Sequence, residues 1–212
     1  MHLWKQTLLE GVLLKKYILI AVLILAIPVA YGTYQYMTPE DIPENLGPAL
    51  GSNLPASIQL PDSSGALQGF DNLTGAKGSV IVFYRSADWC PFCKLQLIGL
   101  NGKNYDEIKA RGYKVAAISY DSVETLATFD QRWDIDYPLL SDADSRIINA
   151  FGLRNENVTS GKGAGIPHPI ILITDASGVV TAKLYEQSYA ARPSVEAVLE
   201  AIDAQGIIDA QG

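Results

Sequence analysis

The stretch SVIVFYRSADWCPFCKLQL, residues 79–97, decides the fold of this chain of 212 residues. It begins with a continuous run of apolar, β-branched and aromatic residues at 79–85, which is typical of a strand buried on both faces. The motif CPFC, residues 90–93, follows a short polar turn and opens a segment with an apolar face at helical spacing. The stretch therefore predicts a buried strand that leads into a helix, with two thiols at the junction.

The position of the two cysteines favours redox chemistry. Unpaired backbone N–H groups and the helix dipole stabilise an anion at a helix start, so a thiolate there is a good nucleophile. We expect Cys90 to attack and Cys93, one turn further on, to resolve a mixed disulfide by forming the Cys90–Cys93 bond. Half of a metal site and two ordinary core thiols are the alternatives. The only histidines are His2 and His168, which argues against a structural zinc site, and we expect no cofactor.

The rest of the chain after residue 55 alternates between strand and helix patterns. In chain order we expect a hairpin of 57–60 and 66–70, a strand at 79–85, a helix over 91–111 with Gly99 and Gly102 as candidate break points, a strand at 113–120, a helix over 122–133, a strand at 137–140, a helix over 142–151, a hairpin of 170–174 and 178–184, and a helix over 192–204. This order predicts an α/β fold with a central mixed sheet flanked by helices.

The N-terminus carries a candidate membrane anchor. Residues 17–34 contain no charge, and as a helix they span roughly 27 Å, close to the hydrocarbon thickness of a bilayer. Lys15 and Lys16 precede this segment and acidic residues follow it, so the positive-inside rule places the N-terminus in the cytoplasm and the rest on the extracytoplasmic side. Tyr31, Tyr34 and Tyr36 resemble an interfacial aromatic belt.

Two other interpretations of this segment remain. It has features of a cleaved signal peptide, with Ala30 and Gly32 as small residues after the apolar run, or it is a buried core helix. We favour a single-pass anchor in the cytoplasmic membrane over 1–36. Residues 37–55 are rich in proline and glycine and predict an extended tether, and 56–212 form the redox domain.

Charge excludes one class of partner. The chain carries 16 basic and 23 acidic residues, a net charge of −7. The part before Met37 is net positive, so the body is more acidic than the whole chain. An acidic body has no electrostatic means of holding a phosphate backbone, so nucleic-acid binding is not expected.

A family resemblance rests on the residues around CPFC. Residues 83–97 resemble the active-site segment of thioredoxin-fold proteins, and are most similar to the peroxiredoxin-like branch of the alkyl hydroperoxide reductase/thiol-specific antioxidant (AhpC/TSA) redoxin family. Residues 137–142, 165–175 and 189–199 resemble later segments of that family. The resemblance covers roughly residues 55–206 and implies a thioredoxin-like fold.

The resemblance also implies roles for residues around the pair. Pro169 would be the cis-proline that faces the disulfide, and His168 would lie beside Cys90, where it tunes the thiolate or relays a proton. The alternative for His168 is a loop histidine with no role. Trp89 would cover the sulfur, and the alternative is a structural aromatic.

Departures from the family pattern limit what the resemblance says about activity. Typical peroxiredoxins have a proline and a threonine where this chain has Phe83 and Ala87, and a late-strand arginine where it has Pro169. Arg85 is a candidate substitute for the missing polar groups, and an end-of-strand surface residue is the alternative. Thioredoxins have a buried acid where this chain has Tyr84.

Three functions follow, in order of preference. The first is a membrane-anchored thiol–disulfide oxidoreductase that exchanges disulfides with protein or small thiol partners. The second is a peroxiredoxin-like thiol peroxidase in which Cys90 is oxidised by peroxide to a sulfenic acid and Cys93 resolves it. The third is a tethered binding module whose disulfide is structural.

Overall fold

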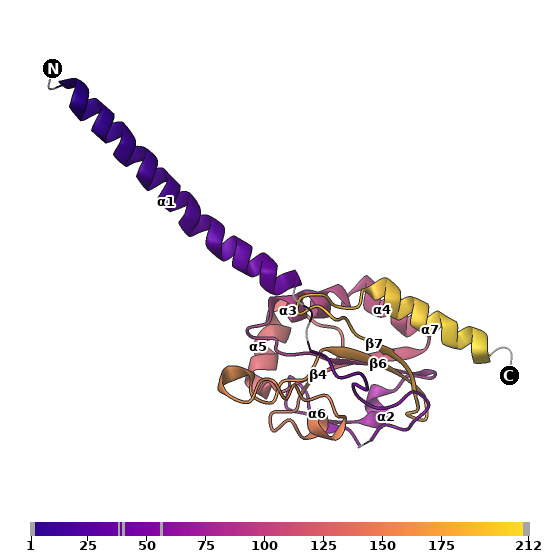
Figure 1. The fold of residues 1–212 in the computed structure, drawn as a ribbon. Helices are drawn as coiled ribbons and strands as arrows, with labels where there is room; N and C mark the ends of the chain where they lie inside the picture. The colour runs from indigo at the N-terminus through magenta and orange to yellow at the C-terminus, as the bar shows by residue number, and fades with distance from the viewer. Residues whose placement is uncertain (1–2, 38, 40, 56, 210–212) are drawn as a thin grey trace. The chain divides into compact units, whose positions relative to one another are not determined.

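The computed structural model describes residues 3–37, 39, 41–55 and 57–209. The chain divides into two compact units, Met1–Glu40 with Ser188–Ala190, and Asp41–Gln187 with Ala191–Gly212. The first unit contains α1 (Leu3–Met37), and the second contains the sheets and all other described helices (Figure 1).

The larger unit is built on a five-stranded sheet in the order β5-β4-β3-β6-β7. Its strands are β3 (Gly78–Phe83), β4 (Tyr113–Ser119), β5 (Leu139–Ser141), β6 (Ile170–Asp175) and β7 (Val180–Leu184). β4 is parallel to β3 and β5, whereas β6 is antiparallel to β3 and β7. The predicted central mixed sheet is confirmed, and the strand predicted from residues 79–85 is its middle strand.

Helices cover both faces of this sheet. Side chains alternate between faces along a strand, so Val80 and Val82 join one apolar cluster while Ile81 and Phe83 join another. The first cluster includes side chains of α3 (Pro91–Gly99), α4 (Lys103–Ala110), α5 (Val123–Trp133) and α7 (Val195–Asp209). The second includes side chains of β1 (Gln59–Pro61), α2 (Phe70–Leu73) and α6 (Arg146–Ala150). β2 (Leu67–Gly69) pairs with β1, and Gly161–Gly163 form a short 3-10 helix, η1.

Some element boundaries differ from the predictions for physical reasons. The break between α3 and α4 is confirmed, and Gly102 has a φ of 60°, which only glycine adopts at no steric cost. The helix expected from residue 142 begins at Arg146, because the Asp142 carboxylate accepts the N–H groups of Ile147 and Ile148 at 3.1 and 2.8 Å and so caps the helix from outside. The last helix begins at Val195, three residues later than expected.

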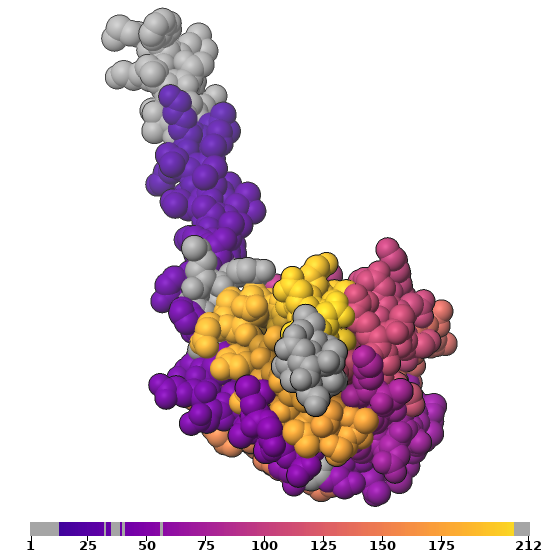
Figure 2. Space-filling model, turned by 90° about the vertical axis from the view of Figure 1, so that its right-hand side faces the viewer, coloured from indigo at the N-terminus to yellow at the C-terminus, as the bar shows by residue number. Residues whose placement is uncertain are grey.

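The tether predicted for residues 37–55 is wrong for its second half, which packs on the domain. Leu46 is 1% exposed and belongs to the second core cluster, where burying its side chain stabilises the fold. Backbone bonds join Gly51 N–H to Val180 O at 2.8 Å and Val180 N–H to Ser52 O at 2.9 Å. β7 is an edge strand, and this segment pairs with the backbone groups of its first residue, Val180. Figure 2 shows the violet segment beside the orange surface of the β6–β7 region.

α1 is one continuous helix that includes Pro28. Residues Leu13–Tyr31 of α1 are long and apolar enough to cross a membrane, and none of them is buried. The alternative of a buried core helix is therefore wrong. A signal sequence passes the same test of length and composition. The side chain of Tyr36, expected in the aromatic belt, lies outside the described residues.

Candidate active site

The two cysteines lie at the start of helix α3, which is the next element after strand β3. Cys90 is the N-cap residue of α3 and its sulfur accepts the N–H of Cys93 at 3.2 Å. Pro91 occupies the first helical turn, where its missing N–H costs nothing. The structure joins Cys90 and Cys93 in a disulfide, and the two residues are 1% and 0% exposed. The two sulfurs are therefore bonded to each other and shielded from solvent, and their redox role stays a prediction.

A guanidinium from a distant part of the chain faces both sulfurs. Nη2 of Arg192 lies 3.5 Å from Sγ of Cys93 and 3.8 Å from Sγ of Cys90. Nη1 donates to the backbone O of Ala191 at 2.5 Å, which orients the group. Because α7 begins only at Val195, Arg192 lies in the extended segment before the helix. A thiolate released from the disulfide would be stabilised by this positive charge.

A buried carboxylate holds the loop that precedes Cys90. Asp121 is 7% exposed and follows β4, the neighbour of β3. It accepts the Ser86 hydroxyl at 2.8 Å, the Ala87 N–H at 2.7 Å and the Ser119 hydroxyl at 2.9 Å. Burial raises the pKa of Asp121, and these hydrogen bonds act in the opposite direction. The carboxylate therefore positions the turn from which the redox helix begins.

The buried acid of thioredoxins is replaced here by a phenol. Tyr84 is fully buried next to the end of β3. Burial first, and then the negative charge of Asp121, raise the pKa of Tyr84, so that its hydroxyl stays neutral. Asp88, just before the pair, is exposed, whereas Asp121 is the first buried carboxylate after the pair.

Trp89 connects the redox turn to a later loop. Its indole N–H donates to the hydroxyl of Tyr120 at 2.8 Å, and that hydroxyl donates to the backbone O of Lys162 in η1. The half-buried Trp89 ring packs against the core cluster that contains both cysteines. The expectation that Trp89 covers the sulfur stays a prediction beside its structural role.

Two of the expected site residues, Arg85 and His168, are buried. Arg85 is 0% exposed, so the alternative of a surface residue is wrong; the residue directly follows the central strand and enters the core with it. His168 is buried, and its backbone N–H donates to the backbone O of Leu153 at 2.7 Å. Its proximity to Cys90 stays a prediction.

The expectation of a cis bond before Pro169 is wrong, because the described residues contain no cis peptide bond. The trans form is the more stable one even before proline. The chain continues directly into β6, whose first residue, Ile170, pairs with Phe83.

Sequence reasoning missed Arg192 and Asp121. Arg192 belongs to the 189–199 segment that resembles the family, but it lies 99 residues after Cys93, and no local pattern connects it to the pair. Asp121 directly follows a predicted buried strand, and a carboxylate at the end of a strand adjacent to the redox strand is a signal that could have identified it. Across the described ranges, no group of three or more His, Cys, Asp or Glu residues could hold a metal ion.

Comparison with known proteins identifies the family. The profile of the AhpC/TSA family matches residues 50–183. The chain belongs to this family. Peroxiredoxin Bcp of Escherichia coli K12 is 32% identical over 136 residues, which cover 64% of this chain and 85% of that protein. A putative peroxiredoxin of Mycobacterium tuberculosis is 30% identical over 134 residues, which cover 63% of this chain and 83% of that protein.

Two solved structures share the fold. Peroxiredoxin Q of Xanthomonas campestris superposes with a TM-score of 0.59 at 26% identity, over 69% of this chain and 90% of that one. Peroxidoxin BcpB of Mycobacterium tuberculosis gives a TM-score of 0.62 at 24% identity, over 73% and 96% of the two chains. These comparisons confirm the predicted thioredoxin-like fold and the resemblance to the peroxiredoxin-like branch. They also confirm the assignment as a peroxiredoxin-like oxidoreductase.

Proposed function

We propose that this AhpC/TSA protein is a thiol peroxidase, with Cys90 as the peroxidatic cysteine and Cys93 as the resolving one. The similarity to Peroxiredoxin Bcp over 85% of that protein is the observation that carries the proposal. It reverses the order of preference drawn from the sequence, in which disulfide exchange came first. The cysteine pair at the start of α3 and the guanidinium beside both sulfurs supply groups that the reaction needs.

The reaction proceeds in two oxidative steps on this chain. The Cys90 thiolate attacks the terminal oxygen of a hydroperoxide; the O–O bond breaks, an S–O bond forms, and the released alkoxide or hydroxide takes a proton. Cys93 then attacks the sulfenic acid of Cys90, and the disulfide forms as water leaves. A thiol reductant returns the pair to the reduced state, so one peroxide is reduced for every two reductant thiols oxidised.

Arg192 replaces a charge that the typical family pattern places elsewhere. The late-strand position expected to carry arginine is Pro169, and the hydroxyl position before the first cysteine is Ala87. The Arg192 guanidinium reaches the sulfurs from the opposite end of the sequence. A fixed cation beside the reacting atoms stabilises both the thiolate and the negative charge that develops as the O–O bond breaks.

The test of this proposal uses Cys93→Ser, which leaves Cys90 without its resolving partner. One equivalent of hydrogen peroxide added to the reduced variant is expected to convert Cys90 to a sulfenic acid, which dimedone captures and mass spectrometry counts. The same variant without peroxide is the control. Absence of the adduct, with Cys90 still a free thiol, would show that peroxide is not the substrate.

Disulfide exchange is the second candidate, because the two cysteines are separated by only two residues and the usual peroxiredoxin proline and threonine are absent. Under exchange, the Cys90 thiolate of Cys93→Ser instead attacks a disulfide of an added partner protein; one sulfur of that disulfide stays bonded to Cys90 and the other leaves as a thiolate. The sulfenic acid and the mixed disulfide differ in mass, so the same spectrum distinguishes the two functions.

We also propose that α1 anchors the enzyme in the cytoplasmic membrane, with the redox domain on the extracytoplasmic side. Support comes from the apolar span Leu13–Tyr31 and from Lys15 and Lys16 near its start. In a bacterial host the protein is expected to sediment with membranes, to resist washing with salt and to be released by detergent. A C-terminal alkaline phosphatase fusion is expected to be active. A soluble product whose mass lacks the N-terminal segment would show a cleaved signal instead.

A further inference from the structure

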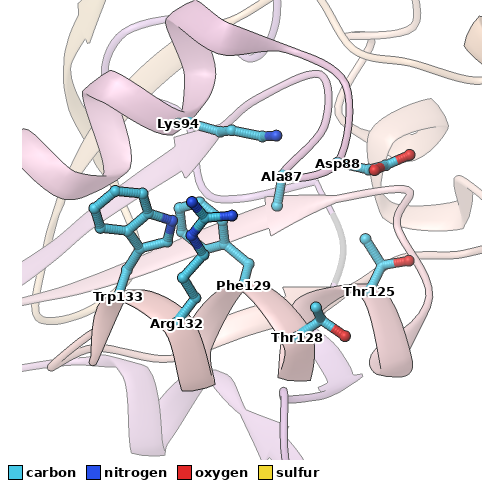
Figure 3. A pocket seen from close by; sticks show the side chains of 8 residues that line it. All are labelled: Ala87, Asp88, Lys94, Thr125, Thr128, Phe129, Arg132 and Trp133. Atoms are coloured by element: carbon cyan, nitrogen blue, oxygen red, sulfur yellow. The ribbon is translucent and has the colours of Figure 1, made fainter.

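A pocket of about 400 Å³ lies between the redox segment and α5 (Figure 3). Ala87, Asp88 and Lys94 line it from either side of the cysteine pair. The other wall is α5, with Phe129, Arg132, Trp133 and two threonines. In Figure 3 the Arg132 guanidinium lies beside the Trp133 ring, the Lys94 side chain extends toward Ala87, and Asp88 lies at the other end. The volume suits a small organic molecule.

The charges of this pocket favour an anion. Among the ion pairs of the described residues, neither Lys94 nor Arg132 has a carboxylate partner within 4.0 Å. The Arg132 guanidinium lies over the Trp133 ring, 5.3 Å from its centroid, which orients its N–H groups. Asp88 also lines the pocket, but it forms no ion pair with either cation, so both remain available to bind a carboxylate ligand through charge-assisted hydrogen bonds.

We propose that this pocket binds a small acidic thiol, the reductant of the Cys90–Cys93 disulfide. This inference rests on the proposed peroxidase cycle, in which the disulfide state present here next reacts with a thiol. The pocket is adjacent to the reacting residues, since Asp88 precedes Cys90 by two positions and Lys94 follows Cys93 directly. Cys90 is only 1% exposed, so a thiol can reach its sulfur only when the covering side chains move. Binding in the pocket keeps the thiol close to Cys90 until that movement occurs.

The reduction balances in two exchange steps. The bound thiolate attacks Sγ of Cys90, a mixed disulfide forms, and Cys93 leaves as a thiolate beside Arg192. A second thiolate attacks the sulfur of the small thiol in the mixed disulfide, which releases the symmetrical disulfide of the reductant. The Cys90 and Cys93 thiolates are then free to take protons, and two electrons have passed from two reductant thiols to the pair.

The experiment measures reduction of the oxidised full-length chain in detergent micelles, with no peroxide present. Mercaptopropionate, mercaptoethanol and cysteamine serve as anionic, neutral and cationic thiols, and each rate is corrected for the thiolate fraction. Rapid alkylation and mass spectrometry follow the free Cys90 and Cys93. We expect the anionic thiol to be the fastest of the three and its rate to saturate with concentration.

Variants of the two cations connect this preference to the pocket. Lys94→Met and Arg132→Met are each expected to lower the ratio of the anionic to the neutral rate about fivefold. Lys103→Met removes an exposed cation of α4 that pairs with Glu107 at 3.7 Å, and is expected to leave the ratio unchanged. A ratio that both pocket variants leave intact would overturn the proposal.

A second arm separates the reductant from the peroxide. The reduced protein is oxidised with a carboxylated and with an uncharged organic hydroperoxide. If Lys94→Met changes the preference in this oxidation and not in the reduction, the pocket binds the peroxide and the proposal is wrong. Failure to react with any peroxide would remove the peroxidase function, yet the reduction rates would still be measurable on the disulfide form.

Discussion

Cys90→Ser is expected to lower the rate of peroxide reduction by at least about a thousandfold, which is the largest effect of any single substitution in this chain. The nucleophile is lost, and Cys93 is a poor replacement because it is fully buried one turn into α3. A serine hydroxyl is not ionised at neutral pH, so it does not attack peroxide. It also cannot form the sulfenic acid that Cys93 would resolve. The measurement is stopped-flow consumption of hydrogen peroxide by the reduced protein, with an uncharged dithiol as reductant.

The matched control for this experiment is Cys93→Ser. With the dithiol left out, that variant is expected to consume one equivalent of peroxide at a rate close to that of the unaltered protein and then stop, because attack precedes resolution. If Cys90→Ser keeps most of the rate and Cys93→Ser loses it, the roles of the two sulfurs are reversed. The start of α3 argues against that outcome, since only Cys90 lies at the N-cap position.

The parts of the fold that depend on local sequence were predicted well. The run 79–85 becomes the central strand β3, and Ser122 caps α5 by accepting the N–H of Thr125 at 3.3 Å. The break between α3 and α4 follows from Gly99 and Gly102, since glycine disfavours helix interiors. These features arise from periodicity, turn residues and capping within a few positions of each other.

The parts that depend on distant packing were not predicted. The composition of 37–55 suggested a tether, yet its apolar Leu46 is buried and its backbone pairs with β7. The bond between Ala87 N–H and Asp121 joins positions 34 apart in sequence. Composition and local spacing carry no information on such contacts. They arise because the order of the strands in the sheet makes segments neighbours that are distant in sequence.

The second large effect is expected from Arg192, whose guanidinium contacts the sulfurs of Cys90 and Cys93. Arg192→Met is expected to lower the rate of Cys90 oxidation by peroxide about a hundredfold, because it removes a fixed cationic donor from the reacting atoms. Arg192→Lys keeps the charge but loses the planar fork, so we expect it to recover part of the rate. The rate is followed by stopped flow, as for the cysteine variants.

A pH profile distinguishes this electrostatic role from a structural one. With the guanidinium gone, the thiolate of Cys90 is less stable, so the midpoint of its alkylation by iodoacetamide in the Cys93→Ser background should move to higher pH. Arg154→Met, which removes an arginine 3.9 Å from Glu156 on another loop, is the control and should leave the midpoint in place. An unchanged midpoint in Arg192→Met, together with a normal peroxide rate, would show that the guanidinium only packs against the disulfide. The predicted shift would instead identify Arg192 as the charge that replaces the late-strand arginine of typical relatives, delivered from the segment before α7.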